Sequence, residues 1–122
     1  MLLRTNDRQR ARILPGLVHR TLAGAADGMR RLSVAETLIA PGARTAPHRH
    51  ACEEVIVVLE GNGTLELGAE RIPFGPRSTI IVPFDTVHRL INDGPAEIRL
   101  IAALSSAEAV VQAPDGRPAA LP

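Results

Sequence analysis

The sequence contains no lysine, no tyrosine and no tryptophan, so all 14 of its basic residues are arginine. Without lysine, Schiff-base chemistry and a P-loop lysine are excluded. Without tyrosine, no phenol is available as an acid. Proton-transfer roles are therefore left to His, Asp, Glu and the single Cys, or to a metal-bound water.

Aromatic side chains are almost absent as well, because the chain has only two Phe. Proteins that hold sugars or single-stranded nucleic acid usually stack them on aromatic rings, so we expect no nucleic-acid partner. The net charge is only +1, so neither positive nor negative charge predominates in the chain. The 45% of hydrophobic residues consists mostly of Val, Ile, Leu and Ala, which must build the core.

Cysteine occurs once, at Cys52, so no intramolecular disulfide can form. A chain without disulfides suits a reducing compartment, and we expect a cytoplasmic protein. The first twelve residues, MLLRTNDRQRAR, lack the apolar region and cleavage site of a secretory signal. No stretch approaches the roughly 20 apolar residues of a membrane span, so we expect no membrane partner.

Short β-branched runs separated by Gly and Pro dominate from about residue 30 onward. About seven such runs recur at spacings of roughly ten residues, which favours an antiparallel all-β sandwich or barrel. At 122 residues the chain is one domain. We predict an N-terminal arm over 1–12, a β-barrel over about 13–105 and a Pro-rich C-terminal tail over about 106–122, with a short helix over 105–113 as an alternative reading of SSAEAVVQA.

The stretch APHRHACEEV carries two of the four histidines. His48 and His50 are two positions apart and share a face of an extended chain, and Glu54 falls on the same face if the strand resumes after a turn. Alone, this cluster is a polar surface turn, a catalytic acid/base group or part of a metal site. His88, at the start of a later strand, supplies a further imidazole, and three His with one carboxylate make a metal site with open positions.

These residues resemble the two motifs of the cupin superfamily. The first motif, G-x5-H-x-H-x3-E-x6-G, runs from Gly42 to Gly61 with every spacing matched. The second is matched by Pro83, His88 and Asn92. The match covers residues 42 to 92 and is similar to small single-domain bacterial cupins, which implies a single antiparallel jelly-roll barrel.

Two glycines of the second motif are replaced. Asp85 stands where the family has Gly, and Arg77 stands six residues before Pro83, with Gly75 two residues early. Both positions lie in expected turns, and Asp tolerates left-handed turn geometry better than most residues. The departures therefore concern the turn conformation and leave the four expected ligands intact.

The resemblance implies one divalent metal ion per chain, held by the three His and Glu54. Manganese or iron is expected first, with zinc, nickel, cobalt or copper as alternatives. It implies a small-molecule substrate and a dioxygenase-type enzyme, with a non-redox isomerase, cyclase or decarboxylase as the alternative and a non-catalytic binding or sensor module as the alternative of another class. It also implies a homodimer.

Further roles follow from strand phase. Glu54 is the first candidate for a catalytic base, and Glu36 is either exposed to solvent or a second base near the metal. His19 is either a partly buried or surface histidine without a functional role, or a proton-transfer group at the pocket mouth. Glu53 is expected to be exposed to solvent. The expected pocket-lining residues are Ile56, Val58, Phe84, Leu90, Leu100 and Cys52.

Overall fold

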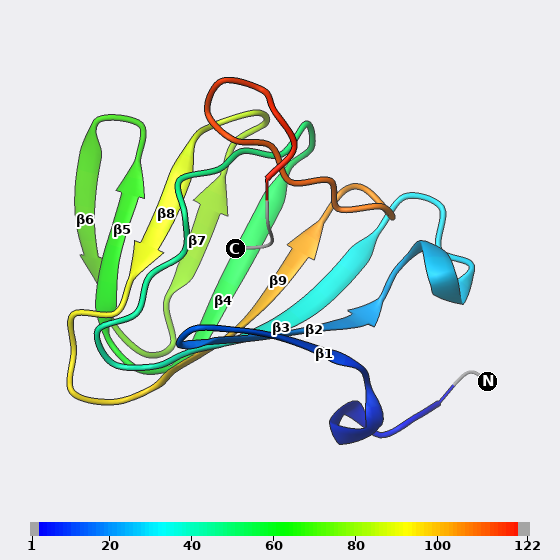
Figure 1. Ribbon diagram of the computed structural model, residues 1–122, viewed down its shortest axis with the longest axis horizontal. Helices are drawn as coiled ribbons and strands as arrows, with labels where there is room; N and C mark the ends of the chain where they lie inside the picture. Colours follow the sequence, from blue (N-terminus) through cyan, green and yellow to red (C-terminus); the bar gives the residue numbers. More distant parts are fainter. Residues whose placement is uncertain (1–2, 120–122) are drawn as a thin grey trace.

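The computed structural model describes residues 3–119, and it is built from strands, with no α-helix in that range (Figure 1). Two short 3₁₀ turns, η1 (Asn6–Arg8) and η2 (Ala25–Asp27), interrupt the connections. Nothing in residues 3–119 forms a helix that is long and apolar enough to cross a membrane. The nine strands are β1 (Ala11–Leu14), β2 (Leu17–Ala23), β3 (Ser33–Ile39), β4 (Glu54–Glu60), β5 (Gly63–Leu67), β6 (Glu70–Phe74), β7 (Thr79–Val82), β8 (His88–Ile91) and β9 (Ile98–Leu104).

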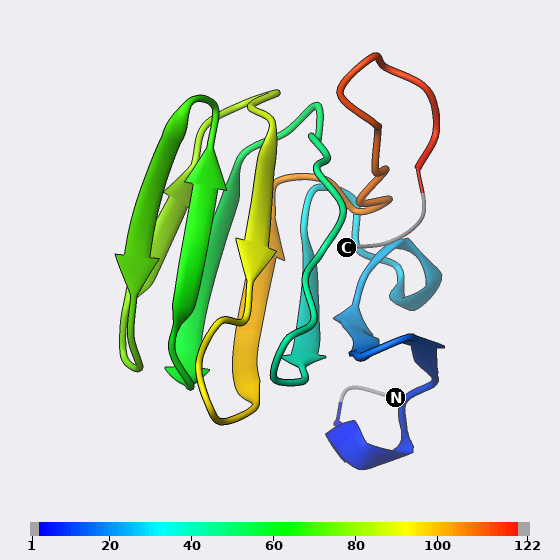
Figure 2. The same cartoon turned by 60° about the vertical axis from the view of Figure 1, so that its left-hand side comes forward.

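The strands form two antiparallel sheets that face each other (Figure 2). The larger sheet has the order β1-β2-β3-β9-β4-β7, and the smaller has the order β6-β5-β8. Isolated bridges from Arg44 to Ile91 and from His48 to His88 lay the segment before β4 along the free side of β8. The all-β jelly roll predicted from the sequence is confirmed, as two facing sheets rather than one closed cylinder.

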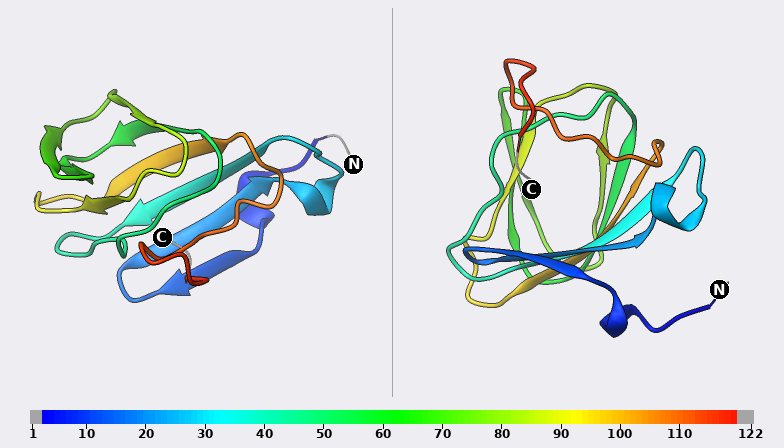
Figure 3. Two further views of the ribbon diagram at one scale, coloured as in Figure 1. Left: turned by 90° about the horizontal axis from the view of Figure 1, so that it is seen from above. Right: turned by 45° about the vertical axis from the view of Figure 1, so that its right-hand side comes forward.

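Strand order and chain ends differ from the prediction in three places. Residues 11–23 form the hairpin β1–β2, which begins slightly before the predicted barrel and lies ahead of residue 30, where strand signals become dominant in the sequence. Residues 105–113 contain no helix, so that alternative reading is wrong. The segment after β9 folds back across the end of the sheets where β9 finishes (Figure 3), and it is tied there by the bridge between Arg49 and Gln112.

Alternation along the central strands places the core between the sheets. The burial of β4 alternates, with Ile56 and Val58 inward, while β9 turns Ile98 and Leu100 inward. On β3 the inward residues are small, Ser33, Ala35 and Thr37, and only the last one, Ile39, is large. The larger β3 side chains Val34 and Leu38 therefore face outward, and the space opposite the small residues is left open.

Motif residues that are not expected metal ligands have structural roles. Gly61 has a φ of 94°, and a Cβ there would lie 2.7 Å from the carbonyl oxygen of Glu97, so no other residue fits the turn between β4 and β5. The Asn92 amide donates to the carbonyls of Ile39 and Ala96 at 2.9 and 2.8 Å. Asn92 therefore fixes the turn after β8.

The two replaced glycines keep the backbone conformation of glycine. Arg77 has a φ of 65° and Asp85 a φ of 55°, both in the left-handed region. A residue with a Cβ costs about 1–2 kcal/mol in that region. The turns are thus retained, and the chain carries local strain at two positions, of which Asp85 lies beside the site through its backbone bond to the His50 carbonyl.

We expect Arg77→Gly to stabilise the protein, because Arg77 is exposed and its backbone N–H bond to the Val58 carbonyl would persist. Relief of left-handed strain, less the added freedom of glycine in the unfolded chain, predicts a gain of about 0.5–1 kcal/mol and a Tm higher by about 2–4 °C. Thermal unfolding followed by circular dichroism measures it. Arg77→Ala is the matched control, since it removes the charge but keeps the strain; equal melting of the two variants would contradict the prediction.

Candidate metal centre and cavity

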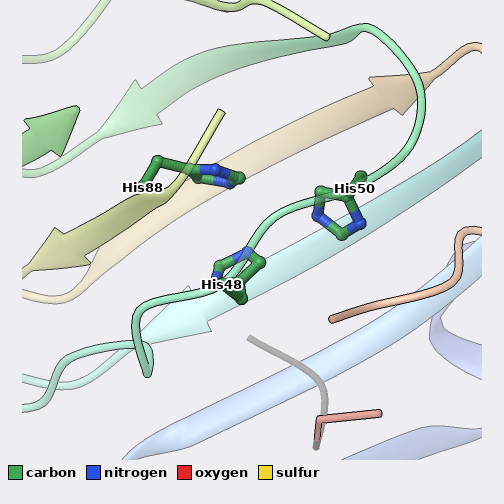
Figure 4. A group of neighbouring side chains, drawn as sticks. All are labelled: His48, His50 and His88. Atoms are coloured by element: carbon green, nitrogen blue, oxygen red, sulfur yellow. The ribbon is translucent and has the colours of Figure 1, made fainter. Parts of the chain in front are cut away.

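Three histidines from two segments converge at one end of the space between the sheets (Figure 4). His48 and His50 lie on the extended segment that precedes β4, and His88 opens β8. The bridge between His48 and His88 aligns the two segments, and the ring centroids of this pair lie 4.2 Å apart. All three side chains are buried, and one ring nitrogen from each lies within 4.8 Å of the others.

Each of these imidazoles is held by a backbone carbonyl through Nδ1. His48 reaches the carbonyl of Ala46 at 2.6 Å, His50 that of Val110 at 3.0 Å, and His88 that of Thr86 at 3.0 Å. A carbonyl oxygen only accepts hydrogen bonds, so each Nδ1 carries the proton and donates it. In the neutral ring, the lone pair is consequently on Nε2, and Nε2 is left free at all three histidines.

Glu54, the first residue of β4, brings a carboxylate to the same place. Its Oε1 lies 3.0 Å from Nε2 of His88 and 3.7 Å from Nε2 of His50, and the side chain is buried. Because the Nδ1 atoms hold the protons, neutral rings would present lone pairs to a carboxylate lone pair. Such an arrangement is stable only when a cation, either a proton or a metal ion, lies between the atoms.

The electrostatics favour a neutral imidazole at His48 and an ionised carboxylate at Glu54. Burial, followed by the charge of His88, lowers the pKa of His48 to about 4 from its usual 6.5. Burial opposes ionisation of Glu54, but the imidazole of His88 at 3.0 Å, followed by His50 and His48, outweighs that effect, so the pKa of Glu54 is lowered. These are the protonation states in which the two residue types bind metals.

A divalent metal fits this donor set. Two atoms bound to one ion at about 2.1 Å can be at most about 4.2 Å apart, so the observed spread within 4.8 Å needs only small adjustments. Nε2 of His50 and Oε1 of Glu54 are buried with no hydrogen-bond partner in the described residues, which is unfavourable unless an ion satisfies them. The Nδ1 bonds to carbonyls are the outer contacts that metal-binding histidines make.

A cavity of about 430 Å³ opens beside the cluster. Its walls are mainly apolar, and its polar groups other than the cluster are few. The apolar part comes from both sheets and from the C-terminal segment, and includes Ile56, Leu90, Leu100, Ala102, Leu104, Ala109 and Val111.

The polar part of the wall lies mostly on β1, β2 and β3, with Arg12, His19, Thr21, Ser33 and Thr37. His19 Nδ1 is 3.1 Å from the hydroxyl of Thr37. The Ser33 hydroxyl is buried and has no hydrogen-bond partner in the described residues. An unpartnered hydroxyl in a cavity wall is available to a ligand oxygen.

Only half of the expected pocket-lining residues line this cavity. Ile56, Leu90 and Leu100 do. Val58 and Cys52 are instead buried in the packed core, and Phe84 is 62% exposed at a turn, so for these three the expectation is corrected. Burial, then the charge of Glu54, raises the pKa of the Cys52 thiol, which is a core residue's environment and not a nucleophile's.

Glu36 is not a second base near the cluster. It is buried, but on the outer side of β3, where its carboxylate pairs with Arg20 at 3.3 Å and Arg99 at 3.1 Å. Its neighbours Ala35 and Thr37 face the cavity, so strand alternation turns Glu36 away. The alternative of a second base near the metal is therefore wrong, and although Glu36 faces outward, it is buried and not exposed to solvent.

The C-terminal segment contributes more than a surface tail would. Val110 supplies the carbonyl that holds His50, and Val111 is buried in the cavity wall. Nothing in the sequence motif pointed to these residues. The only signal was the apolar pair Val110-Val111 within an otherwise polar, Pro-rich stretch.

The chain is similar to known proteins over most of its length. The family model described as auxin binding protein matches residues 5–110. Auxin-binding protein 1 of Arabidopsis thaliana is 37% identical over 101 residues, which cover 75% of this chain and 51% of that protein. The chain thus spans about half the length of the auxin-binding relatives it matches. Polyketide synthase CurC of Streptomyces cyaneus is 31% identical over 100 residues, covering 81% of this chain and 62% of that protein.

Solved structures show the same fold. The polyketide cyclase RemF from Streptomyces resistomycificus superposes with a TM-score of 0.77 at 25% identity, covering 100% of this chain and 88% of RemF. An RmlC-like cupin from Shewanella frigidimarina superposes with a TM-score of 0.76 at 18% identity, covering 88% of this chain and 92% of that one. The bacterial type of cupin stays a prediction. With a family model that matches residues 5–110, the chain belongs to the auxin-binding protein family and has the fold of a small single-domain cupin.

Proposed function

We propose that this protein is a metal-dependent enzyme that cyclises a small, largely apolar, oxygen-bearing molecule by non-redox chemistry. The metal would be one divalent ion held by His48, His50, Glu54 and His88. The observation that carries the proposal is the convergence of Nε2 atoms freed by the three Nδ1 bonds to carbonyls, beside a buried carboxylate oxygen that has no partner in the described residues.

The bound ion would supply Lewis acidity toward a substrate oxygen. The chain's own residues would orient the ion's ligands, exclude water and bind the substrate. The backbone carbonyls fix the tautomers of the histidines, and Glu54 supplies negative charge. The apolar wall excludes water from the substrate, and Ser33 offers its unpartnered hydroxyl to a second oxygen.

The substrate class is supported by the wall and by two relatives. A cavity of about 430 Å³ is at the small end of ligand sites, and its apolar lining suits a compact carbon skeleton with a few carbonyl or hydroxyl groups. The names of both CurC and RemF refer to polyketides, and the match to RemF covers the whole of this chain. A short polyketide-like substrate is therefore our first choice, ahead of the oxygenase expected from the sequence.

The second candidate is a binding module without turnover. It is favoured by the family itself, whose model and plant relatives are named for binding auxin. In that case the same cavity would hold a small organic acid, with its carboxylate toward the metal.

Further properties stay proposals. Manganese or iron remains the first expectation for the ion, and the His-rich donor set also suits zinc, nickel, cobalt or copper. We propose a homodimer through the outer face of the larger sheet, where Val55, Val57 and Ile81 are exposed. A cytoplasmic location is supported by the single reduced cysteine.

Metal analysis tests the ligand set. Protein expressed without a tag and loaded with Mn, Fe or Zn should hold about one ion per chain. His88→Ala should lower the affinity by more than the roughly 10–100-fold that loss of an outer contact causes. His19→Ala is the matched control, because His19 lies outside the cluster, and it should bind the ion like the wild type. Equal sub-stoichiometric metal in all three proteins would refute the metal site.

The metal-free protein should lose stability in mild acid. The pKa of His48 is lower in the folded chain (about 4) than its usual 6.5, so the unfolded chain binds more protons between these values. The stabilisation is complete above about pH 6.5 and is lost as the pH falls toward 4, by on the order of 1–3 kcal/mol. Urea titrations of chelator-treated protein across this window measure it. His48→Gln should flatten the dependence, and an unchanged slope in that variant would contradict the assignment.

Turnover separates the candidates. Metal-loaded protein is incubated with a short linear β-polyketone, with mass spectrometry for the ring product and an electrode for oxygen. We expect the dehydrated ring to form at least about 100-fold faster than in buffer, without oxygen uptake. Oxygen uptake with an oxidised product would support the oxygenase instead. Tight metal-dependent binding of naphthalene-1-acetate with no turnover would support the binding module.

A further inference from the structure

The fourth histidine of the chain lies in the cavity that the metal cluster borders. His19 is on β2, opposite Arg12 of β1 and Thr37 of β3 in the strand register. All three residues line the cavity. The β1–β2–β3 part of the larger sheet therefore brings a titratable ring to the wall, whose other ionisable residues outside the metal cluster are Arg12, Asp27 and Glu108.

The ring of His19 is oriented by Thr37. Nδ1 of His19 lies 3.1 Å from the Thr37 hydroxyl, which is the only side-chain hydrogen bond of this ring within residues 3–119. Leu17 and Thr21, two residues to either side, share the inward phase of β2. With Nδ1 engaged, Nε2 is the nitrogen left for a molecule in the cavity.

The charges around His19 keep the ring neutral. Burial and then the charge of Arg12 lower the pKa of His19, and Glu54 on β4 acts in the opposite direction. Thr37 on β3 is a neutral partner. Arg20 and Glu36 are adjacent in sequence or register but pair with each other on the outer side of the sheet. Near neutral pH the ring is therefore an uncharged acceptor.

The other acid–base groups of the described residues are engaged, lie outside the cavity or, in the case of Asp27 and Glu108, line it with side chains that are exposed to solvent. Glu54 is within 3.0 Å of His88 in the metal cluster, Glu36 faces outward, and Cys52 is packed in the core. His19 is thus a polar group that the metal cluster does not use and that the cavity exposes to a ligand.

We infer that His19 is the acid–base residue of this cavity, and that Thr37 positions it. It acts on a ligand that carries a C–H bond next to a carbonyl group, as the polyketide-like substrates of the proposed function do, and the inference rests on that proposal. His19 is a catalytic residue in this scheme, because Nε2 contacts the reacting atoms.

The proton steps balance within one molecule of substrate. Nε2 takes the proton from the carbon next to one carbonyl, and the electron pair of the broken C–H bond forms a new C–C bond to a second carbonyl carbon of the same molecule. The oxygen of that second carbonyl takes up the electron pair of its π bond and then receives the proton from His19. Ring closure thus leaves His19 neutral again, with no oxidant or reductant consumed.

Deuterium uptake tests the first step with a simple probe. Metal-loaded protein in D₂O is incubated with acetophenone, and loss of the methyl proton signal is followed by NMR. We expect exchange above the buffer rate, and His19→Gln should lower the protein-catalysed rate by at least about 100-fold. The same rate in His19→Gln as in the wild type, or no catalysed exchange by the wild type, would overturn the inference.

Three further variants separate positioning from general structure. Thr37→Val should slow exchange about 10-fold and Thr37→Ser should restore it, since serine keeps the hydroxyl beside Nδ1. Arg12→Gln removes a neighbouring positive charge, so the acid limb of the rate–pH profile should move to higher pH. If Thr37→Ser is as slow as Thr37→Val, or the acid limb stays in place, the assigned roles are wrong.

Metal content and melting temperature, measured on every variant, distinguish this inference from the proposed function. Full metal content in His19→Gln with unchanged exchange would remove only the role of His19. Loss of metal binding in the wild type would remove the metal centre itself, whatever the exchange rate.

Discussion

The orientation of three imidazole rings by three backbone carbonyls is the constraint on which the site depends. Carbonyls of Ala46, Thr86 and Val110 each accept a proton from Nδ1, and this decides where the lone pairs of the rings point. Two of the carbonyls lie two residues before the histidine that they hold, so local backbone shape is sufficient for His48 and His88. The third comes from 60 residues away, so His50 is oriented only when the C-terminal segment lies across the end of the sheets.

The fold and the ligand cluster could be predicted because both are encoded locally. Alternation in β4 and β9, the glycines of the tight turns and the spacing of His48, His50 and Glu54 depend on residues that are close in sequence. His88 could be predicted as well, because it belongs to the second motif, at the start of a later strand, which is β8 of the smaller sheet. Even where Arg77 and Asp85 replace glycine, the backbone keeps the left-handed turn, which shows that the surrounding strands determine these turns more strongly than the residue does.

The cavity wall was harder to predict, since it depends on which phase of a strand faces inward. In β3, Val34 and Leu38 are the more apolar phase, yet Ser33, Ala35 and Thr37 are buried. A hydrophobic-inside rule selects the wrong face here, because a ligand cavity requires small inward side chains rather than a filled core. The same ambiguity left two alternatives open for Glu36, the solvent and the metal, and two for His19, of which the structure places Glu36 on the outer face and His19 in the cavity wall beside Thr37.

The small inward residues of β3 connect the packing of the larger sheet to the chemistry of the site. Larger residues at those positions would fill the space and stabilise the sandwich by burial of roughly 25 cal/mol per Å² of apolar surface. The chain instead leaves the space open and keeps in it a cluster of buried polar atoms, of which His50 Nε2, Glu54 Oε1 and the Ser33 hydroxyl have no partner within residues 3–119. Unsatisfied buried polar groups cost about 1–3 kcal/mol each, so an arrangement that retains three of them beside an open cavity is explained by what it binds and not by its own stability. Because two of these atoms belong to the proposed ligand set and the third to the polar wall, the proposed metal ion and an oxygen of the proposed organic ligand would together satisfy them.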